Sequence, residues 1–203
     1  MKNRGKSNNK KTQWADHLTQ KAKAENYPAR SVYKLMEIQK RFRVIKKGGR
    51  VLDLGCSPGS WLIYAAKTAG ASGTAVGIDL KPVETKLPDN AVAHTGDIFE
   101  MEPTLGEAVG NGYDSVLSDM APATTGRKDV DSARSFDLCE AALRVACDLL
   151  APGGNFVCKI FQGAEFKQFE KDVKSRFAQH KIFKPESCRK SSKEIYIIGI
   201  DKK

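Results

Sequence analysis

Short apolar runs with polar residues near their ends recur along the chain from residue 50 onward, which is typical of buried strands. Stretches with apolar residues at spacings of three and four lie between several of these runs and indicate amphipathic helices. The predicted strands cover residues 50–56, 73–80, 91–97, 113–120, 154–161, 181–184 and 194–201. Because strands alternate with helices, the pattern predicts right-handed βαβ units and an α/β fold around a mostly parallel sheet.

The predicted helices beside these strands cover residues 60–70, 136–150 and 163–178. Before the first strand, residues 14–49 are basic but carry an apolar face, which predicts a helix of about three turns that begins near Ser31. We expect the Ser31 hydroxyl to cap this helix. A chain of 203 residues with 40% hydrophobic content fits one domain over residues 14–203, in which the basic helical segment precedes a core over residues 50–203.

Basic side chains dominate the start of the chain. Residues 1–13 contain five lysines and arginines and no acidic side chain. Such a segment cannot bury enough apolar surface to fold, so we predict a mobile basic arm. The formal net charge of +10 favours a polyanionic partner such as nucleic acid. Charge alone leaves a second interpretation open, in which the basic side chains only keep the protein soluble.

The cysteines and histidines give no sign of a metal or disulfide site. The five cysteines form no Cys-x-x-Cys pair and the three histidines lie far apart, whereas unpaired thiols fit a reducing cytosol. The basic N-terminus lacks the apolar core of a signal peptide, and no apolar run approaches the ~20 residues that span a bilayer. We therefore expect a cytoplasmic monomer with no bound metal and no membrane partner.

A glycine-containing turn follows the first predicted strand. It has the pattern Asp53-x-Gly55-x-x-Pro58-Gly59. The glycines let a ligand approach the backbone, and the helix that follows offers free N–H groups at its N-terminus. The spacing differs from the Gly-x-Gly-x-x-Gly pattern of dinucleotide sites, so a nucleotide-dependent oxidoreductase is disfavoured.

Two further carboxylates end the next two predicted strands. Asp79 ends the second strand, where a carboxylate can bind both hydroxyls of an adenosine ribose, and Asp97 ends the third, where it can accept from an adenine amino group. Ligands of open α/β sheets bind beyond the carboxyl ends of the strands. The sequence therefore predicts a nucleoside site, although each aspartate alone could be a strand-end cap. Class I methyltransferases have this arrangement, and by that resemblance the ligand is S-adenosylmethionine.

A charged residue lies within the fifth predicted strand. Lys159 lies among apolar residues, and burying an unpaired ammonium group is costly, so it needs a partner. Asp119 ends the neighbouring strand, beside the same cleft, and is the natural one. In the alternative interpretation Lys159 reaches solvent from the end of its strand.

Five separated blocks resemble the FtsJ/RrmJ (RlmE-type) family of ribosomal RNA methyltransferases. These blocks are residues 30–35, 53–61, 118–122, 159–161 and 191–196, in the family's order. The resemblance runs from about residue 16 to residue 200. It implies the class I, Rossmann-like methyltransferase fold, with a mostly parallel seven-stranded sheet and helices on both faces. Small residues at Cys56 and Ser57, where relatives often have alanines, are a minor departure.

The resemblance also implies roles for individual residues. The family's catalytic tetrad corresponds to Lys34, Asp119, Lys159 and Glu194. Its cofactor positions correspond to Gly59, Trp61, Asp79, Asp97 and Asp119, beside Asp53, Gly55 and Pro58 of the turn. Nothing else in the sequence distinguishes Lys34 or Glu194 from solvated charges. Lys159 is expected to act as the base: burial and Lys34 lower its pKa, Asp119 and Glu194 raise it, and the sequence does not decide which effect is larger.

The implied activity is S-adenosylmethionine-dependent methylation of a ribose 2′-hydroxyl, on a uridine of large-subunit (23S-type) ribosomal RNA. The partner is that RNA or the assembled large subunit. The residues expected to contact RNA phosphates are Lys10, Lys11, Arg30, Lys34, Arg41, Arg43, Arg189 and Lys193. Alternatives are a 2′-O-methyltransferase of tRNA or of an mRNA cap, and a non-catalytic RNA-binding ribosome-assembly factor. Amino-group methylation is disfavoured because the block at residues 119–122 lacks the aromatic signature of those enzymes.

Overall fold

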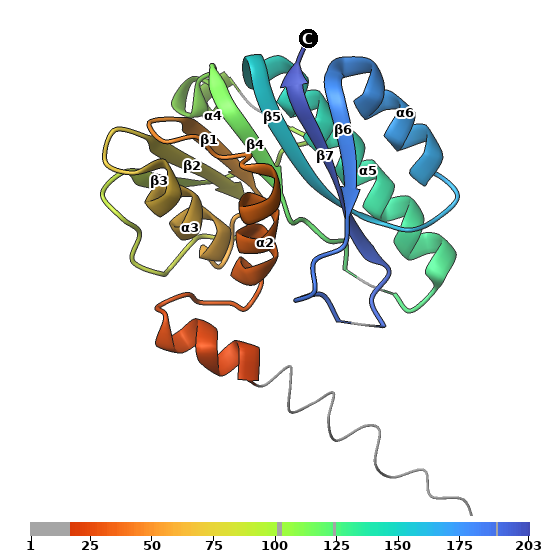
Figure 1. The fold of residues 1–203 in the computed structure, drawn as a ribbon, viewed down its shortest axis with the longest axis horizontal. Coiled ribbons are helices and arrows are strands. Elements are labelled where there is room, and N and C mark those ends of the chain that lie inside the picture. The colour runs from red at the N-terminus through yellow and green to blue at the C-terminus, as the bar shows by residue number, and fades with distance from the viewer. Residues whose placement is uncertain (1–16, 101–102, 124, 190) are drawn as a thin grey trace, which may run out of the picture.

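The structure, a computed structural model, describes residues 17–100, 103–123, 125–189 and 191–203. The predicted arm over residues 1–13, with Lys10 and Lys11, lies outside the described residues. A seven-stranded sheet in the order β3-β2-β1-β4-β5-β7-β6 runs through the middle of the fold (Figure 1). Strand β7 is antiparallel to β5 and β6, whereas the other neighbours are parallel. The predicted α/β fold class is confirmed.

All seven predicted strands are present, with different bounds. They are β1 (Arg50–Leu54), β2 (Thr74–Asp79), β3 (Ala91–Thr95), β4 (Tyr113–Ser118), β5 (Leu150–Phe161), β6 (Phe177–Phe183) and β7 (Glu194–Lys202). Five strands, β1 to β4 and β6, end earlier than predicted, because the chain turns out of the sheet there. Strand β5 begins at Leu150 rather than residue 154, and β6 begins at Phe177, where a helix was expected to continue to residue 178.

The helices are α2 (Val32–Phe42), α3 (Ser60–Ala69), α4 (Pro103–Val109), α5 (Lys128–Leu149) and α6 (Phe166–Arg176), and residues 17–24 form a further short helix. Helix α4 was not predicted, and α5 begins well before residue 136. The predicted capping of α2 is wrong: Ser31 precedes the helix, but its side chain makes no capping hydrogen bond. Its backbone is already helical, with φ −56° and ψ −23°, whereas a capping serine has non-helical dihedral angles.

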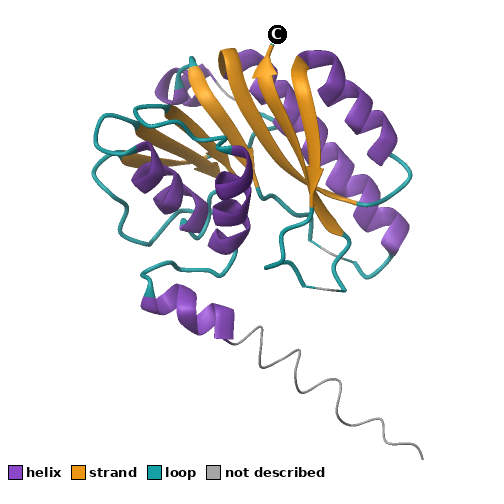
Figure 2. Cartoon of the chain, in the orientation of Figure 1, coloured by secondary structure: helices purple, strands orange, loops and turns teal. Residues whose placement is uncertain are grey.

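Helices cover both faces of the sheet (Figure 2). Helices α2 and α3 pack on one face, where Leu35, Leu62 and Val157 share a buried apolar cluster. Helices α5 and α6 pack on the other face, where Ala142 and Phe169 belong to a second cluster. Alternate strand residues point to opposite faces, so both faces of this sheet are apolar, as mostly parallel sheets require.

The register of the sheet brings three segments to one edge. Leu54, the last residue of β1, is paired with Ile78 on β2 and with Ser118 on β4. The residues that come next, Asp79 at the end of β2 and Asp119 after β4, therefore lie beside the turn that follows β1. Within the described ranges no helix is long and apolar enough to cross a membrane.

Candidate active site

The turn after β1 depends on two glycines with positive φ. Gly55 has φ +76° and Gly59 has φ +111°, which L side chains rarely adopt. A Cβ at Gly55 would also collide with the side chain of Met120. The turn is held against β2 because the Ser57 N–H donates to Asp79 Oδ2 over 2.9 Å. The sequence thus forms a close backbone turn that opens directly into helix α3.

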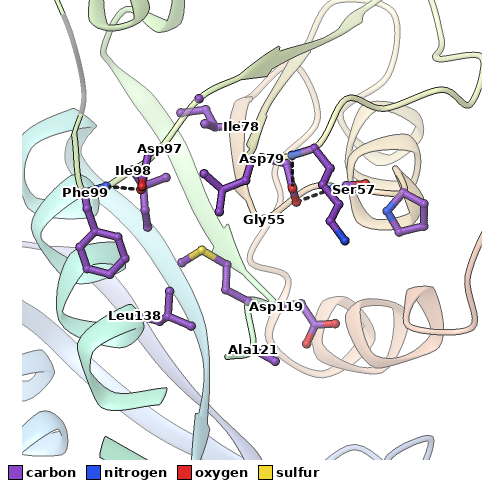
Figure 3. A pocket seen from close by; sticks show the side chains of 15 residues that line it. Gly55, Ser57, Ile78, Asp79, Asp97, Ile98, Phe99, Asp119, Ala121 and Leu138 are labelled. Carbon is purple, nitrogen blue, oxygen red and sulfur yellow. Dashed lines mark hydrogen bonds between the residues drawn. The ribbon is translucent and has the colours of Figure 1, made fainter. Parts of the chain in front are cut away.

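A pocket of about 500 Å³ lies at this edge of the sheet (Figure 3). Its lining includes Gly55 and Pro58 of the turn, Asp79, Asp97 and Asp119, together with Ile78, Ile98, Phe99, Met120 and Leu138. Two of the carboxylates are oriented by their own loops. Asp79 Oδ1 accepts the Lys81 N–H over 2.8 Å, and Asp97 Oδ1 accepts the Phe99 N–H over 2.9 Å. Apolar walls with a few fixed polar groups are typical of small-molecule sites.

Asp53 lies buried beneath this pocket. Its residue surface is 1% exposed, and neither carboxylate oxygen makes a hydrogen bond of ordinary geometry, although the Leu62 N–H near the start of α3 lies close enough to favour the ionised form. Burial, followed by the nearby carboxylates of Asp119 and Asp79, raises the pKa of Asp53 well above its ordinary value. In the described part of the chain, no ion pair neutralises Asp53, Asp79 or Asp97. The lining thus holds two carboxylates without ion pairs, Asp79 and Asp97, against one ammonium group, Lys81, so the pocket is acidic and suits a nucleoside that carries positive charge.

The four predicted tetrad residues meet beside this pocket. Lys159 Nζ lies 3.0 Å from Asp119 Oδ1, and Lys34 Nζ lies 3.6 Å from the same oxygen and 3.1 Å from Glu194 Oε2. Lys159 follows Val157 by two residues on β5 and is paired with Tyr196 on β7, so it faces helix α2, which carries Lys34. The expected pairing of Lys159 with Asp119 is thus present.

Asp119 is the centre of this cluster. Besides the two ammonium groups, its Oδ1 accepts a hydrogen bond from the Tyr196 hydroxyl over 2.5 Å. Lys159 Nζ also donates to the backbone carbonyl of Asp119. Because Asp119 lines the acidic pocket as well, it joins the pocket to the ion-pair cluster. Lys159 is only 6% exposed, so a substrate must come into direct contact with the cluster to reach its amine.

The environment of Lys34 keeps it charged. Burial opposes its positive charge, but Asp119 and Glu194 outweigh burial, so the pKa of Lys34 is raised. Burial and the same two carboxylates raise the pKa of Tyr196 well above its ordinary value, so its phenol remains a hydrogen-bond donor. Among the described residues, no group of three or more His, Cys, Asp or Glu side chains is arranged to hold a metal ion.

Comparisons with known proteins agree with this geometry. The sequence model described as FtsJ-like methyltransferase matches residues 27–202. The chain belongs to this family. A protein of Desulforapulum autotrophicum named ribosomal RNA large subunit methyltransferase E is 80% identical over 203 residues, all of both chains. A protein of the same name from Desulfatibacillum aliphaticivorans is 54% identical over 95% of this chain and 93% of its own.

A solved structure has the same fold as this FtsJ-like chain. A crystal structure described as a ribosomal RNA methyltransferase of Plasmodium falciparum superposes with a TM-score of 0.75. It is 26% identical to this chain, covering 87% of it and 98% of the solved chain. The expected Rossmann-like architecture is confirmed by this neighbour together with the seven-stranded sheet.

Some residues expected at the cofactor site of this FtsJ-like chain do not line the pocket. Gly55, Pro58, Asp79, Asp97 and Asp119 line it, whereas Asp53, Gly59 and Trp61 do not. The Trp61 ring is buried. Its Nε1–H donates to the Ser31 carbonyl over 2.9 Å, and the ring stacks on Tyr196 at 5.9 Å between centroids. Trp61 therefore braces α3 against α2 and β7.

The residues expected to contact RNA are spread over several elements. Arg43, Arg189 and Lys193 are exposed, and so is Arg41, whose guanidinium lies 5.2 Å from the Phe183 ring centre. Arg30 is different, because its Nη2 donates to the Ser187 carbonyl over 3.2 Å and burial, with Arg189 nearby, lowers its pKa. Arg30 thus fastens the loop between β6 and β7 to the N-terminal segment.

Sequence reasoning missed two functional neighbours of the tetrad. Tyr196 lies two residues after Glu194 on β7, so strand alternation alone puts both on one face of the sheet. Glu37 lies one helical turn from Lys34, and its carboxylate accepts the N–H groups of Glu186 and Ser187 over 2.6 and 2.9 Å. No local pattern in the sequence pointed to this second contact, because it joins residues about 150 positions apart.

Proposed function

We propose that this chain transfers the methyl group of S-adenosylmethionine to the 2′-hydroxyl of a uridine ribose in large-subunit ribosomal RNA. One observation carries the proposal: the buried Lys159 is ion-paired with Asp119, and Asp119 also lines the acidic pocket. The names of the close relatives support ribosomal RNA of the large subunit as the substrate class. The enzyme acts in the cytoplasm, as a monomer with a single domain over residues 14–203.

The pocket residues suit the proposed cofactor. S-adenosylmethionine supplies a methyl group activated by a positively charged sulfur. The uncompensated carboxylates favour such a cation, and 500 Å³ lies within the ~300–1,000 Å³ range of small-molecule pockets. Asp79 binds the ribose hydroxyls and Asp97 the adenine amino group. The backbone of the turn with Gly55, Pro58 and Gly59 would contact the cofactor, whereas the buried Asp53 and Trp61 would support that turn.

The tetrad residues suit the proposed reaction at the ribose. A 2′-hydroxyl is a weak acid, so its attack needs a positioned base. Lys159 holds this hydroxyl and accepts its proton at Nζ when its amine is neutral. Asp119 and the cationic Lys34 set the charge of that amine, and Glu194 holds Lys34 in place over 3.1 Å.

Exposed basic side chains suit the proposed RNA substrate. Arg41, Arg43, Arg189 and Lys193 lie on α2 or its end and on the loop before β7, the two segments that also supply Lys34 and Glu194. These side chains bind phosphates around the target nucleotide. The arm over residues 1–13, with Lys10 and Lys11, contributes further phosphate contacts, as do the less exposed Arg30 and Lys34.

The test is transfer of labelled methyl from S-adenosylmethionine to undermethylated large ribosomal subunits, with tRNA and capped RNA offered in parallel. We expect label on the large subunit alone, recovered after nuclease digestion as a 2′-O-methylated uridine. Label on tRNA or on the cap would retain the reaction and overturn the substrate. Cofactor binding without transfer to any of these RNAs would overturn the catalytic proposal.

A further inference from the structure

A second, smaller pocket lies beside the tetrad. It has a volume of about 180 Å³ and is lined by Asp131, Ser132, Phe161, Gln162, Ser192 and Lys193. These residues come from the start of α5, the end of β5 and the segment that leads into β7. The three segments lie at the same end of the sheet, at the bottom of the view in Figure 1. No role assigned so far uses this pocket, although Lys193 is among the expected RNA contacts.

The pocket adjoins the reacting group. Phe161 is paired with Glu194 across β5 and β7, and the Gln162 N–H donates to the Lys193 carbonyl over 3.1 Å. Phe161 follows Lys159 by two residues, which places it about 7 Å further along the strand and on the same face. In a nucleotide the 2′-oxygen and the base are attached to neighbouring ribose carbons. A ribose held at Lys159 therefore places its base within reach of Phe161.

The lining suits a neutral, flat, polar-edged group. Phe161 supplies an aromatic ring, and Gln162 supplies both a donor and an acceptor. The Ser132 hydroxyl donates to Glu165 Oε2 over 3.4 Å, and the Ser192 hydroxyl accepts the Glu194 N–H over 3.1 Å, which leaves the Ser192 proton to donate. Gln162 is exposed, and within the described ranges its side chain makes no hydrogen bond. A volume of 180 Å³ is that of about six waters, which is room for one base but too little for a whole nucleotide.

The charges of the lining argue against a phosphate. Asp131 and Lys193 carry opposite charges, so the pocket has no excess of positive charge. The Asp131 carboxylate accepts hydrogen bonds from Thr125 and Gly126, the nearest being 2.7 Å from the Thr125 N–H, and its pKa is lowered by them. A phosphate placed here would lie against a fixed anion, whereas the N–H and C=O groups of a base can bind both charges.

We propose that this pocket receives the unstacked base of the nucleotide whose 2′-hydroxyl is methylated, with Phe161 contacting its ring and Gln162 its polar edge. The inference rests on the proposed function and adds the site that selects the acceptor. Enzymes that react with one nucleotide of a folded RNA take its base out of the stack and bind it against aromatic and amide side chains. A base bound at Phe161 fixes the ribose, and so aims the 2′-oxygen at Lys159.

The experiment compares two substrates and two variants. The substrates are undermethylated large subunits and the same subunits reconstituted with rRNA whose acceptor nucleotide lacks its base. The variants are Gln162→Ala in the pocket and Gln179→Ala as a matched control, which is exposed on β6 at the far end of the β6–β7 pairing. Each enzyme is assayed for kcat/KM with both substrates, and for S-adenosylhomocysteine affinity by calorimetry.

Removing the base is expected to lower kcat/KM of the wild-type enzyme roughly 10- to 100-fold. Gln162→Ala is expected to lose about 10-fold on intact subunits and nothing further on the baseless ones, with cofactor affinity unchanged. Gln179→Ala behaves as wild type on both. Equal losses by Gln162→Ala on the two substrates, or none on either, overturn the inference alone. Absence of transfer by the wild-type enzyme to intact subunits overturns the proposed function, and the inference with it.

Discussion

The acidic pocket and the tetrad lie side by side and share Asp119, yet they are built in opposite ways. In the pocket, Asp79 and Asp97 are oriented by backbone N–H groups two residues further along the chain. In the tetrad, the contact between Lys34 and Glu194 spans 160 positions and that between Asp119 and Tyr196 spans 77. Local loops thus orient the carboxylates of the first region, where the longest of these hydrogen bonds, from Ser57 to Asp79, spans 22 positions, whereas the folded sheet assembles the second.

The two regions also differ in charge. The pocket keeps Asp79 and Asp97 without ion pairs in the described part of the chain, whereas the tetrad balances two lysines with Asp119 and Glu194. Excess negative charge favours a cationic ligand before it binds. A balanced cluster lets one amine gain or lose a proton while its neighbours compensate the change. The difference suggests that binding and proton transfer can be disabled separately.

Lys159→Ala gives the largest expected effect and acts on the tetrad alone. The variant loses the proposed base and is expected to lower kcat about 10²- to 10⁴-fold. Because Lys159 does not line the pocket, cofactor affinity stays within about threefold. Methyl transfer under single-turnover conditions and calorimetric titration measure the two quantities. Lys171→Ala, exposed on α6, is the control, and near-normal turnover by Lys159→Ala with an intact fold would refute its role.

Asp79→Asn acts on the pocket alone. It removes the charge that is proposed to bind the ribose hydroxyls, and we expect cofactor affinity to fall roughly 10- to 100-fold. At saturating cofactor, kcat is expected to remain within about threefold of wild type. Asp148→Asn, at an exposed position on α5, should change neither. A large loss of kcat at saturation would show that the two regions are not separable.

Asp53→Asn tests the uncompensated charge beneath the pocket. The pKa of Asp53 is raised on folding, so between its ordinary value near 4 and its folded value the folded state binds more protons than the unfolded state. The unfolding free energy of the cofactor-free protein therefore falls as pH rises through that range. Asp53→Asn removes this loss.

Urea unfolding between pH 4.5 and 7.5 measures the effect of Asp53→Asn. Across this range, the unfolding free energy of the wild type is expected to fall relative to that of the variant. Asp148→Asn should follow the wild-type profile. If wild type and Asp53→Asn gave parallel profiles, folding would not raise the pKa of Asp53, which would contradict the environment that the structure gives this carboxyl group.

Ser31→Ala gives the smallest expected effect and concerns the helix that carries Lys34. Its hydroxyl makes no capping bond, so the unfolding free energy should change by less than about 0.3 kcal/mol, against the ~1 kcal/mol of a lost cap. Asn90→Ala is the contrasting variant, because the Asn90 amide donates to the carbonyls of Ala66, Gly70 and Gly73 beside α3. It should cost about 1–3 kcal/mol by chemical denaturation. Equal losses would mean that Ser31 caps α2 after all.

Much of the fold follows from local pattern. Apolar runs identified every strand, and the βαβ order predicted the parallel part of the sheet. Strand ends were less well predicted: β5 begins at Leu150, four residues early, where Pro152 and Gly153 give no strand signal. Helix α4 is short and has few apolar residues, so its periodicity is too weak to detect. Pairing with neighbouring strands, rather than the strand propensity of the local residues, fixes where β5 begins.

By itself the sequence determined the strands, the glycine turn, and the positions of Asp79 and Asp97 at the strand ends, because each depends on residues adjacent in the chain. Family resemblance added Lys34 and Glu194. Only the tertiary structure decided that Trp61 donates to the Ser31 carbonyl and that, among the described residues, Asp53 is buried without an ion pair. It also decided that Tyr196 donates to Asp119. These contacts form only when α2, β4, β5 and β7 pack together, because the residues that make them lie far apart in the chain. No local sequence pattern predicts which of them will be in contact.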